Sequence, residues 1–285
     1  MNEATLVYYN GQFLTKQEIR ISPDDRGFLF ADGVYEVILS YKGTFFRFEK
    51  HVQRMQRGLR ELRIDFPALH SLQEVAETLI RENHFEHRDA KVYVQITRGA
   101  APRSHTFPNP DVPPTVYAAA SPFQLSRQVW EEGATVLLVP DIRWARCDIK
   151  SIALLPNTLA FQQAKEAGAH EAVFVRDGVV TEGAHTNFCA VYKGTLFTAP
   201  TSNYILAGIT RKVLLNLCQE LHIPVQEFPI FEKDLPRADE CLIAGTTTEI
   251  TPVVQINERV IGSGTPGPIT KALQQAFQQL AYPDF

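Results

Sequence analysis

The residue with the clearest chemical potential in this sequence is a single lysine in an apolar stretch. Lys150 lies between Ile149 and Ile152, within residues 142–155. Burial of an ammonium ion is costly, so a buried lysine has a lowered pKa and becomes a neutral amine. Such an amine is a nucleophile that can form an imine with an aldehyde cofactor. Taken alone, the segment favours the alternative, a lysine at a strand end whose stem covers apolar surface while its head stays in water.

A carboxylate later in the chain would complement that amine. Glu182, in Thr181-Glu182-Gly183, follows a strand-like segment and could face the nitrogen of a heteroaromatic ring. At ~4 Å and an effective dielectric of ~20 the pair is worth ~4 kcal/mol. This corresponds to ~3 pKa units, enough to keep a pyridine protonated at neutral pH. A protonated ring withdraws electrons from a neighbouring carbanion. The alternative is a surface glutamate at a turn.

Three features could bind a phosphate. Gly208-Ile209-Thr210-Arg211 opens a helix, where free backbone N–H groups and the helix dipole favour an anion. Gly245-Thr246-Thr247-Thr248 offers hydroxyls and N–H donors after a strand. Arg54 could hold a phosphate in a bidentate grip. Singly, each has an ordinary alternative: a helix cap, a threonine-rich strand or a surface arginine.

The composition predicts a globular, two-domain protein. The 285 residues are 45% hydrophobic and 21% charged, and the net charge of −4 gives no bulk attraction to nucleic acid or anionic lipid. We expect no membrane span, no secretory signal and no metal site. The cysteines are scattered without a Cys-x-x-Cys pair, which favours reduced thiols and a cytoplasmic location; they are Cys147, Cys189, Cys218 and Cys241.

The first half of the chain predicts an α+β domain over 1–121, followed by a linker over 122–132. Its expected elements are a hairpin around Asn10-Gly11, strands at 34–40, 44–48, 91–97 and 115–120, and helices at 49–63 and 70–84. A proline-rich loop over 98–110 separates the last two strands. Loops of this length in a compact domain are usually functional or mobile.

The second half predicts a larger domain over 133–285. Its expected elements are a strand at 134–139, a strand carrying the lysine, a helix at 159–167, hairpins at 171–181 and 187–199, a helix at 210–222, strands at 241–244, 253–256 and 260–261, and a closing helix. Neither βαβ alternation nor Gly-x-Gly-x-x-Gly is visible, which argues against a dinucleotide-binding fold.

Several motifs in fixed order make the chain similar to one family. The sequence resembles the fold type IV pyridoxal-phosphate enzymes, the class IV aminotransferases, and among them the D-amino-acid transaminases. The resemblance covers nearly the whole chain and rests on residues 30–36, 98–105, 146–151, 181–183 with Asn187, 208–211, 246–252 and 262–264. It implies a small N-terminal α/β sandwich and a larger C-terminal domain that is β-barrel-like with helices.

The resemblance also implies a role for each motif residue. Lys150 would hold pyridoxal 5'-phosphate as a Schiff base and move the proton between substrate and cofactor carbons, and Glu182 would pair with the ring nitrogen. The remaining cofactor contacts would be phosphate ligands and one residue on the ring face, namely Arg54, Ile209, Thr210, Thr246 and Leu206. The substrate carboxylate would be trapped by Tyr35, Arg103 and His105, the last two reaching in from the other subunit of an obligate homodimer.

The Arg103-Ser104-His105 loop favours D-amino acids, because branched-chain L-transaminases of this fold lack it. Lysine delivers its proton from one fixed face, so the docking position of the carboxylate sets the product's configuration. Ala184-His185-Thr186 departs from the small hydroxyl residues usual in the D-specific relatives. His185 could contact the phosphate or crowd the substrate pocket.

The expected function is transamination from a D-amino acid, such as D-alanine or D-glutamate, to a 2-oxo acid such as 2-oxoglutarate or pyruvate. Three alternatives stay open: an aminodeoxychorismate lyase, an (R)-amine or branched-chain transaminase of the same fold, and an inactive dimeric homologue acting as a binding protein. The sequence does not rank the amino donors.

Overall fold

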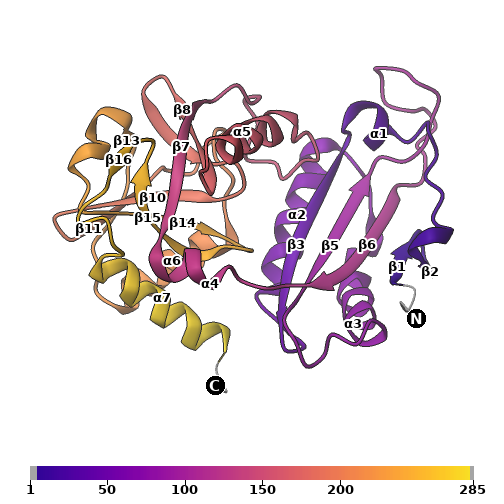
Figure 1. Cartoon of the computed structure of the whole chain (residues 1–285). Helices are drawn as coiled ribbons and strands as arrows, with labels where there is room; N and C mark the ends of the chain where they lie inside the picture. Colours follow the sequence, from indigo (N-terminus) through magenta and orange to yellow (C-terminus); the bar gives the residue numbers. More distant parts are fainter. Residues whose placement is uncertain (1–4, 283–285) are drawn as a thin grey trace. The chain divides into compact units, whose positions relative to one another are not determined.

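The chain divides into two units whose boundary differs from the expected one. The computed structural model describes residues 5–282. The first unit runs to Gln124 and also contains Ile149–Ala153, while the second comprises Leu125–Asp148 and the chain from Leu154 onward. The expected C-terminal domain over 133–285 included the lysine segment, and the expected linker over 122–132 contains a helix, α4 (Arg127–Glu132), of the second unit. Figure 1 shows the elements of both units.

The first unit is a six-stranded antiparallel sheet, as its hairpin and alternation patterns predict, with strand order β2-β1-β6-β5-β3-β4. Its strands are β1 (Leu6–Tyr9), β2 (Gln12–Thr15), β3 (Gly33–Tyr41), β4 (Thr44–Phe45), β5 (Ala90–Thr97) and β6 (Thr115–Pro122). Its helices are η1 (Lys16–Glu18), α1 (Arg26–Phe30), α2 (Phe48–Leu62), η2 (Pro67–Ser71) and α3 (Leu72–Glu82). Asn10, with a φ of 45°, and Gly11, at 89°, form the turn of the predicted hairpin.

Helices α2 and α3 cover one face of this sheet, because each carries an apolar stripe at helical spacing. Met55 and Leu59 of α2 and Leu79 of α3 are buried in one cluster with the alternating residues of β5. Those strand residues are Ala90, Val92, Val94 and Ile96. The α/β sandwich expected for the N-terminal half is therefore confirmed.

Two residues of the first unit's central strand hold the lysine segment. The backbone N–H of Tyr35 donates to the carbonyl of Lys150, and Ile152 donates to Gly33. Val34 forms an isolated antiparallel bridge with Ser151. The lysine-bearing strand expected from the sequence is wrong, since residues 141–154 contain this single bridge and otherwise no strand. Because its apolar residues face the first unit, the segment leaves the second unit locally.

The second unit contains a sheet path of nine strands, joined at its side by β16. Its strands are β7 (Ala134–Pro140), β8 (Glu171–Arg176), β9 (Val179–Gly183), β10 (Asn187–Tyr192), β11 (Thr195–Thr198), β12 (Val225–Glu227), β13 (Ile230–Phe231), β14 (Glu240–Gly245), β15 (Glu249–Ile256) and β16 (Arg259–Val260). Its helices besides α4 are α5 (Leu155–Glu166), α6 (Ile209–Glu220), η3 (Glu232–Arg237) and α7 (Pro268–Ala281).

Six of these strands close into a barrel. The path β10-β14-β15-β7-β8-β9 becomes a ring because β9 and β10 also pair, through Glu182 and Asn187. The interior is filled by apolar residues, among them Val136, Val173, Phe188 and Ile243. The expected barrel-like C-terminal domain is confirmed, and the pair that closes it includes a candidate catalytic residue.

The second unit also contains two parallel strand pairs joined through helices. β7 and β8 are parallel and connected through α5, and β11 and β12 are parallel and connected through α6. The expectation that βαβ connections are absent is therefore wrong for these two places. The long irregular segment between β7 and α5 hid the first connection, since such units usually have short loops.

Candidate active site

Lys150 and Tyr35 lie together in the first unit. The amine of Lys150 lies 4.2 Å from the centre of the Tyr35 ring, so the two side chains meet as well as the two backbones. Lys150 is half-buried, whereas its neighbour Ile149 is buried at 5% exposure. The lysine is therefore neither the fully buried amine nor the solvated surface side chain that the sequence offered as alternatives.

Beside this lysine, Glu36 joins His51 and Arg54 in a buried ion cluster. Its carboxylate accepts from Nε of Arg54 at 2.7 Å and from a terminal guanidinium nitrogen at 2.8 Å. The oxygen that accepts this terminal nitrogen, Oε2, also lies 2.8 Å from Nδ1 of His51. Burial opposes ionisation, but Arg54 and His51 together lower the pKa of Glu36 to about 2. Burial lowers the pKa of His51, and the nearby charge of Lys150 adds to this effect. The cluster was missed from the sequence, although Glu36 stands within a quoted motif.

The Arg-x-His loop is tied to the first unit by buried arginines. Arg26 donates from Nε to Asp32 at 2.9 Å and from a terminal nitrogen to the carbonyls of Ser104, at 2.6 Å, and Thr106. Arg98 forms a bidentate pair with the same Asp32, at 2.7 and 3.0 Å. Residues 98–110 thus form the predicted loop, and its base is fixed by buried charge.

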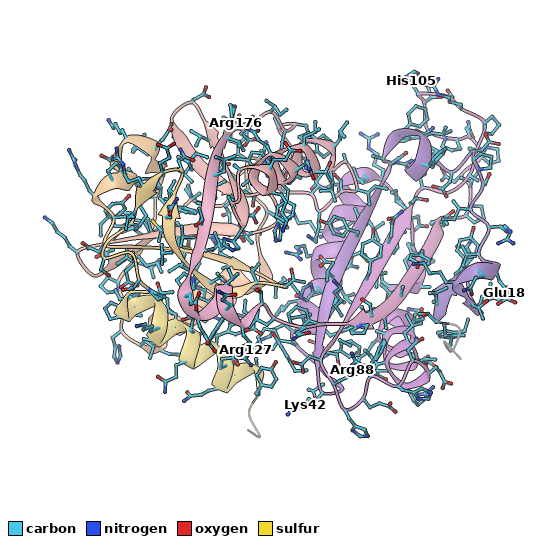
Figure 2. All side chains as sticks on the ribbon, in the orientation of Figure 1. Glu18, Lys42, Arg88, His105, Arg127 and Arg176 are labelled. Carbon is cyan, nitrogen blue, oxygen red and sulfur yellow. The ribbon has the colours of Figure 1, made fainter. Side chains whose placement is uncertain are left out.

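The tip of that loop presents a cation and an imidazole around one aromatic ring. Arg103 lies 5.1 Å from the centre of the Phe30 ring, and the His105 ring lies 5.6 Å from it. Both side chains are exposed, and Figure 2 shows His105 at the outer end of the loop. The two predicted residues therefore share one aromatic neighbour on a tethered loop whose tip is exposed.

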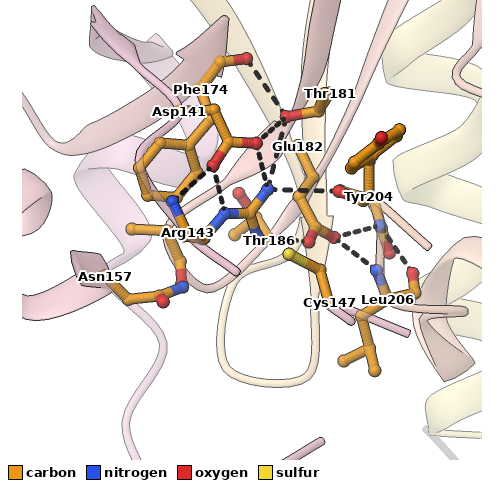
Figure 3. A network of polar contacts seen from close by, with 12 residues as sticks. Asp141, Arg143, Cys147, Asn157, Phe174, Thr181, Glu182, Thr186, Tyr204 and Leu206 are labelled. Atoms are coloured by element: carbon orange, nitrogen blue, oxygen red, sulfur yellow. Dashed lines mark hydrogen bonds and ion pairs between the residues drawn. The ribbon is translucent and has the colours of Figure 1, made fainter. Parts of the chain in front are cut away.

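Glu182 is the central acid of the second unit. It is 5% exposed and accepts three hydrogen bonds (Figure 3): from Arg143 at 2.6 Å, from the Leu206 N–H at 2.9 Å and from the Asn187 amide at 3.1 Å. Burial raises the pKa of Glu182 to about 7, while Arg143 and the Leu206 N–H act in the opposite direction. The surface glutamate offered as the alternative is excluded by this burial.

Arg143 holds Glu182 and was not singled out from the sequence. It forms a bidentate pair with Asp141, at 2.9 Å from both oxygens, and its guanidinium lies 4.2 Å from the centre of the Phe174 ring. Arg176 donates to Asp141 from the other side, at 3.3 Å. No periodicity or motif marks this arginine, because apart from Asp141 its partners come from β8, β9 and the distant segment at Tyr204.

The second unit provides a cradle suited to a phosphate. Helix α6 begins at Ile209 and Thr210, and no side chain of the described residues caps it at Gly208. A Cβ added to Gly208 would collide with Asn187, and one added to Gly245 would lie 2.8 Å from Oγ1 of Thr248. Strand β14 ends at Gly245 and β15 begins at Glu249, and the two strands pair as a hairpin. The turn between them consists of three threonines, of which Thr246 is the first.

One buried hydroxyl in this cradle lacks a partner. Oγ1 of Thr248 has no hydrogen-bond partner within residues 5–282, although it is shielded from solvent. A buried polar atom of this kind usually has a partner, so an anion or water in the turn would satisfy it. Together with the uncapped helix, the glycines and the buried carboxylate, it fits pyridoxal phosphate, which carries a phosphate and a basic ring nitrogen.

His185 lies on the turn between β9 and β10, beside this cradle. Its Nδ1 lies 2.9 Å from an oxygen of Glu171, which is 1% exposed, and Thr186 donates to the same carboxylate at 3.0 Å. The His185 carbonyl oxygen would lie 3.3 Å from a Cβ added to Gly245. The turn is therefore packed against the threonine hairpin, and the imidazole is held at one nitrogen.

The predicted site residues thus form two groups. The first unit contains Lys150 in contact with Tyr35, and it also carries Arg54 and the loop with Arg103 and His105. The second unit contains Glu182 in contact with Leu206, and it also carries Ile209, Thr210 and Thr246. The residues missed from the sequence are the ones that hold these side chains in place.

Comparison with known proteins agrees with this description. The model of the amino-transferase class IV family matches residues 33–256. A D-alanine aminotransferase of Staphylococcus haemolyticus is 40% identical over 276 residues, which cover 96% of this chain and 97% of the relative. A D-alanine aminotransferase of Bacillus licheniformis is 39% identical over 273 residues, 95% of each chain.

Solved structures show the same fold. The branched-chain amino acid aminotransferase of Escherichia coli superposes with a TM-score of 0.90 at 27% identity, covering 98% of this chain and 95% of the other. A branched-chain amino acid aminotransferase of T.th., solved with pyridoxamine 5'-phosphate, gives 0.90 at 28% identity, covering 99% and 96%.

The fold and these relatives define a pyridoxal-phosphate-dependent aminotransferase, whose substrates are small amino and oxo acids. The chain belongs to the amino-transferase class IV family. In the part of the chain that the structure describes, no helix combines the length and the apolar character needed to cross a membrane.

Proposed function

We propose that this enzyme transfers the amino group of a D-amino acid, such as D-alanine or D-glutamate, to a 2-oxo acid such as 2-oxoglutarate or pyruvate. The observation that carries the proposal is the tethered loop with Arg103 and His105 at its exposed tip. A guanidinium and an imidazole side by side suit a carboxylate. The similarity to D-alanine aminotransferases over nearly the whole chain supports the same specificity.

In this proposal Lys150 attaches the cofactor and moves the substrate proton. When bound, pyridoxal phosphate supplies a carbonyl that reacts with amines and a ring that accepts electrons from the substrate's α-carbon. The Lys150 amine would accept the proton of the substrate's α-carbon on one face and hold it for the return transfer. Its position over the Tyr35 ring, fixed by backbone hydrogen bonds, restricts the direction from which it acts.

Other residues of the proposed site bind and orient. Glu182 would pair with the ring nitrogen of the bound cofactor and Leu206 would pack on its ring, while Arg54, Ile209, Thr210 and Thr246 would hold its phosphate. Arg54 donates two of its N–H groups to Glu36, so fewer of its donors are left to bind the phosphate. The N–H groups of the α6 N-terminus and of the threonine turn then provide most of the hydrogen bonds that stabilise the phosphate.

The D-configuration follows from where the carboxylate docks. In the proposed arrangement Tyr35 contacts the carboxylate together with Arg103 and His105 of the partner subunit, in a cytoplasmic homodimer. The exposure of both side chains, with His105 at the outer end of the loop in Figure 2, supports a role in a neighbouring site. Because the proton arrives from a fixed face, a carboxylate held on this side yields the D-product.

The test compares donors on purified enzyme. D-alanine, D-glutamate, L-leucine and an (R)-amine are each supplied with 2-oxoglutarate or pyruvate, and the rate of exchange is measured. We expect turnover with the D-amino acids and little with L-leucine. Preferred turnover of L-leucine would overturn the proposal. Release of pyruvate from aminodeoxychorismate without amine exchange would instead identify a lyase.

Substitution of Arg103 tests the loop directly. Arg103→Ala should lower kcat/KM for D-alanine on the order of 100-fold, the effect of one lost charge-assisted contact of about 1.5–3 kcal/mol. Turnover of an (R)-amine, which has no carboxylate, should change little. Arg127→Ala is the matched control, since Arg127 is also exposed and lies over an aromatic ring, that of Trp130. Equal effects of both substitutions would contradict a specific role.

A further inference from the structure

Arg143 is fixed from several sides and is not available as a ligand for substrate. Its guanidinium donates to Asp141, to Glu182, to Oγ1 of Thr181 at 3.3 Å and to the carbonyl of Tyr204 at 3.2 Å. Its side chain is 5% exposed, and the Phe174 ring covers one face. Figure 3 shows that these contacts converge on one guanidinium. A structural ion pair alone would require only one of the two carboxylates.

The contacts of Glu182 divide between its two oxygens. Oε1 receives the guanidinium at 2.6 Å, and Oε2 receives the Leu206 N–H and the Asn187 amide. The plane of the carboxylate is therefore fixed by donors on both sides. Arg143 is the sole cation in direct contact with it among the residues from 5 to 282. Without that cation, burial would favour the neutral acid.

We infer that Arg143 is a positioning residue that keeps Glu182 ionised and so determines whether the proton shared with the cofactor's ring nitrogen resides on the ring. The inference rests on the proposed contact between Glu182 and that nitrogen. It adds a residue for which the sequence gives no signal and which acts through Glu182 without touching the substrate.

One proton has two possible positions between Glu182 and the cofactor's ring nitrogen. The pair holds either an ionised carboxylate with a protonated ring or a neutral acid with a neutral ring. The guanidinium is in contact with the carboxylate and farther from any group beyond it. Its charge therefore stabilises the ionised carboxylate more than it destabilises the ring cation. Removal of Arg143 moves the proton to Glu182, and a neutral ring accepts electrons less well.

The groups around Glu182 allow its ionisation to be followed separately. They are Arg143, Asp141, Cys147 and, beyond Asp141, Arg176. Burial raises the pKa of Cys147 to about 11, so this thiol is neutral near pH 7. Burial opposes the ionisation of Asp141, but Arg143 and Arg176 lower its pKa below the usual range. Between about pH 5 and 9, Glu182 is therefore the group in this set that changes charge.

The experiment measures holoenzyme variants of the full chain. Single-turnover rates with D-alanine and the absorption spectrum of the bound cofactor are recorded against pH for Arg143→Met, Arg143→Lys and Arg176→Met. Loss of the neighbouring cation should move the acid limb of the rate upward by about one to three pH units and shift the spectral titration with it. The rate near neutral pH should fall on the order of 10- to 100-fold. Arg143→Lys should restore part of both.

A control variant and a double variant test whether Arg143 acts through Glu182. Arg176→Met removes a half-buried cation that contacts Asp141 but not Glu182, so its acid limb should stay in place. In a Glu182→Gln background, Arg143→Met should cause little further loss. An unchanged limb in both Arg143 variants would overturn the inference, and if Arg143→Met does not fold, an unchanged limb in Arg143→Lys does so alone. An unchanged spectrum and rate in Glu182→Gln would instead refute the proposed role of Glu182.

Discussion

The side-chain amide of Asn187 bonds to Glu182 at the one register position where β9 pairs with β10. The same amide donates to the Leu206 carbonyl at 3.0 Å, while the Leu206 N–H donates to Glu182. The closure of the barrel and the orientation of the buried acid are therefore one structural feature. A substitution that weakens the pairing of β9 with β10 should therefore also make the orientation of the Glu182 side chain less fixed.

Replacement of that amide should have two effects. Asn187→Ala leaves Glu182 and the Leu206 carbonyl short of a donor, at a cost of about 1–3 kcal/mol in the free energy of unfolding. Urea denaturation measures this cost, and a spectral titration should show weaker pyridoxal phosphate binding. Asn157→Ala is the control, because Asn157 donates to the Ala184 carbonyl at 2.7 Å without contacting Glu182. Equal pyridoxal phosphate affinity in the two variants would show that the barrel closure does not influence the cofactor site, and would contradict this prediction.

The Glu36 cluster should make the stability of the protein sensitive to acid. The pKa of Glu36 is about 2 in the folded state, against an ordinary value of 4.5 for a glutamate in the unfolded chain. A lowered folded pKa gives stability that is present above pH 4.5 and lost as the pH falls toward 2. The 2.5-unit difference corresponds to about 3 kcal/mol.

Urea denaturation of the wild type and of Glu36→Gln between pH 6 and pH 2.5 measures this effect. The difference in unfolding free energy should be largest at the upper end and shrink below pH 4.5. Glu18→Gln, at an exposed carboxylate, should show a much smaller change. A pH-independent difference between wild type and Glu36→Gln would show that lost packing, and not ionisation, causes the destabilisation.

Arg26 should control the loop that carries the proposed carboxylate contacts. Arg26→Leu removes the hydrogen bonds to the Ser104 and Thr106 carbonyls and leaves Asp32 with Arg98 as its remaining arginine partner. We expect faster proteolysis within 98–110 and a KM for D-alanine raised on the order of tenfold, because the tip is no longer pre-oriented. Arg20→Leu, at an exposed arginine bonded to local carbonyls, should change neither. An unaltered proteolysis rate in Arg26→Leu would contradict the tether.

His185 should act on the cofactor phosphate more than on the substrate. Its turn packs on the hairpin that carries Thr246, and Glu171 holds Nδ1, which leaves Nε2 for a second partner. His185→Ala should weaken pyridoxal phosphate binding on the order of tenfold and change pyridoxal binding little, because a charge-assisted contact is lost. His170→Ala, at an exposed histidine, is the control. An improved KM for bulky D-amino acids with unchanged cofactor affinity would indicate that His185 crowds the pocket instead.

Patterns local in the chain were predictable from the sequence. Asn10-Gly11 predicts a turn because both residues tolerate positive φ, and the stripe of Met55 and Leu59 predicts a helix covering a sheet. The order of the motifs predicted the family, which the comparisons confirmed. Lys150, Glu182 and the glycines at 208 and 245 each had an ordinary alternative when taken singly, and the motifs in fixed order made them candidates.

The partners of these residues were decided by the tertiary structure alone. Arg143 meets Glu182 across 39 positions of sequence, and Arg26 meets the Ser104 carbonyl across 78, distances over which no local periodicity carries information. The lysine segment joins the first unit because it forms backbone hydrogen bonds with β3. No property of residues 149–153 themselves predicts these hydrogen bonds. Residue type thus indicated which groups could react. Folding decided which donors and charges surround them, because contacts, burial and pKa depend on neighbours that are distant in the chain.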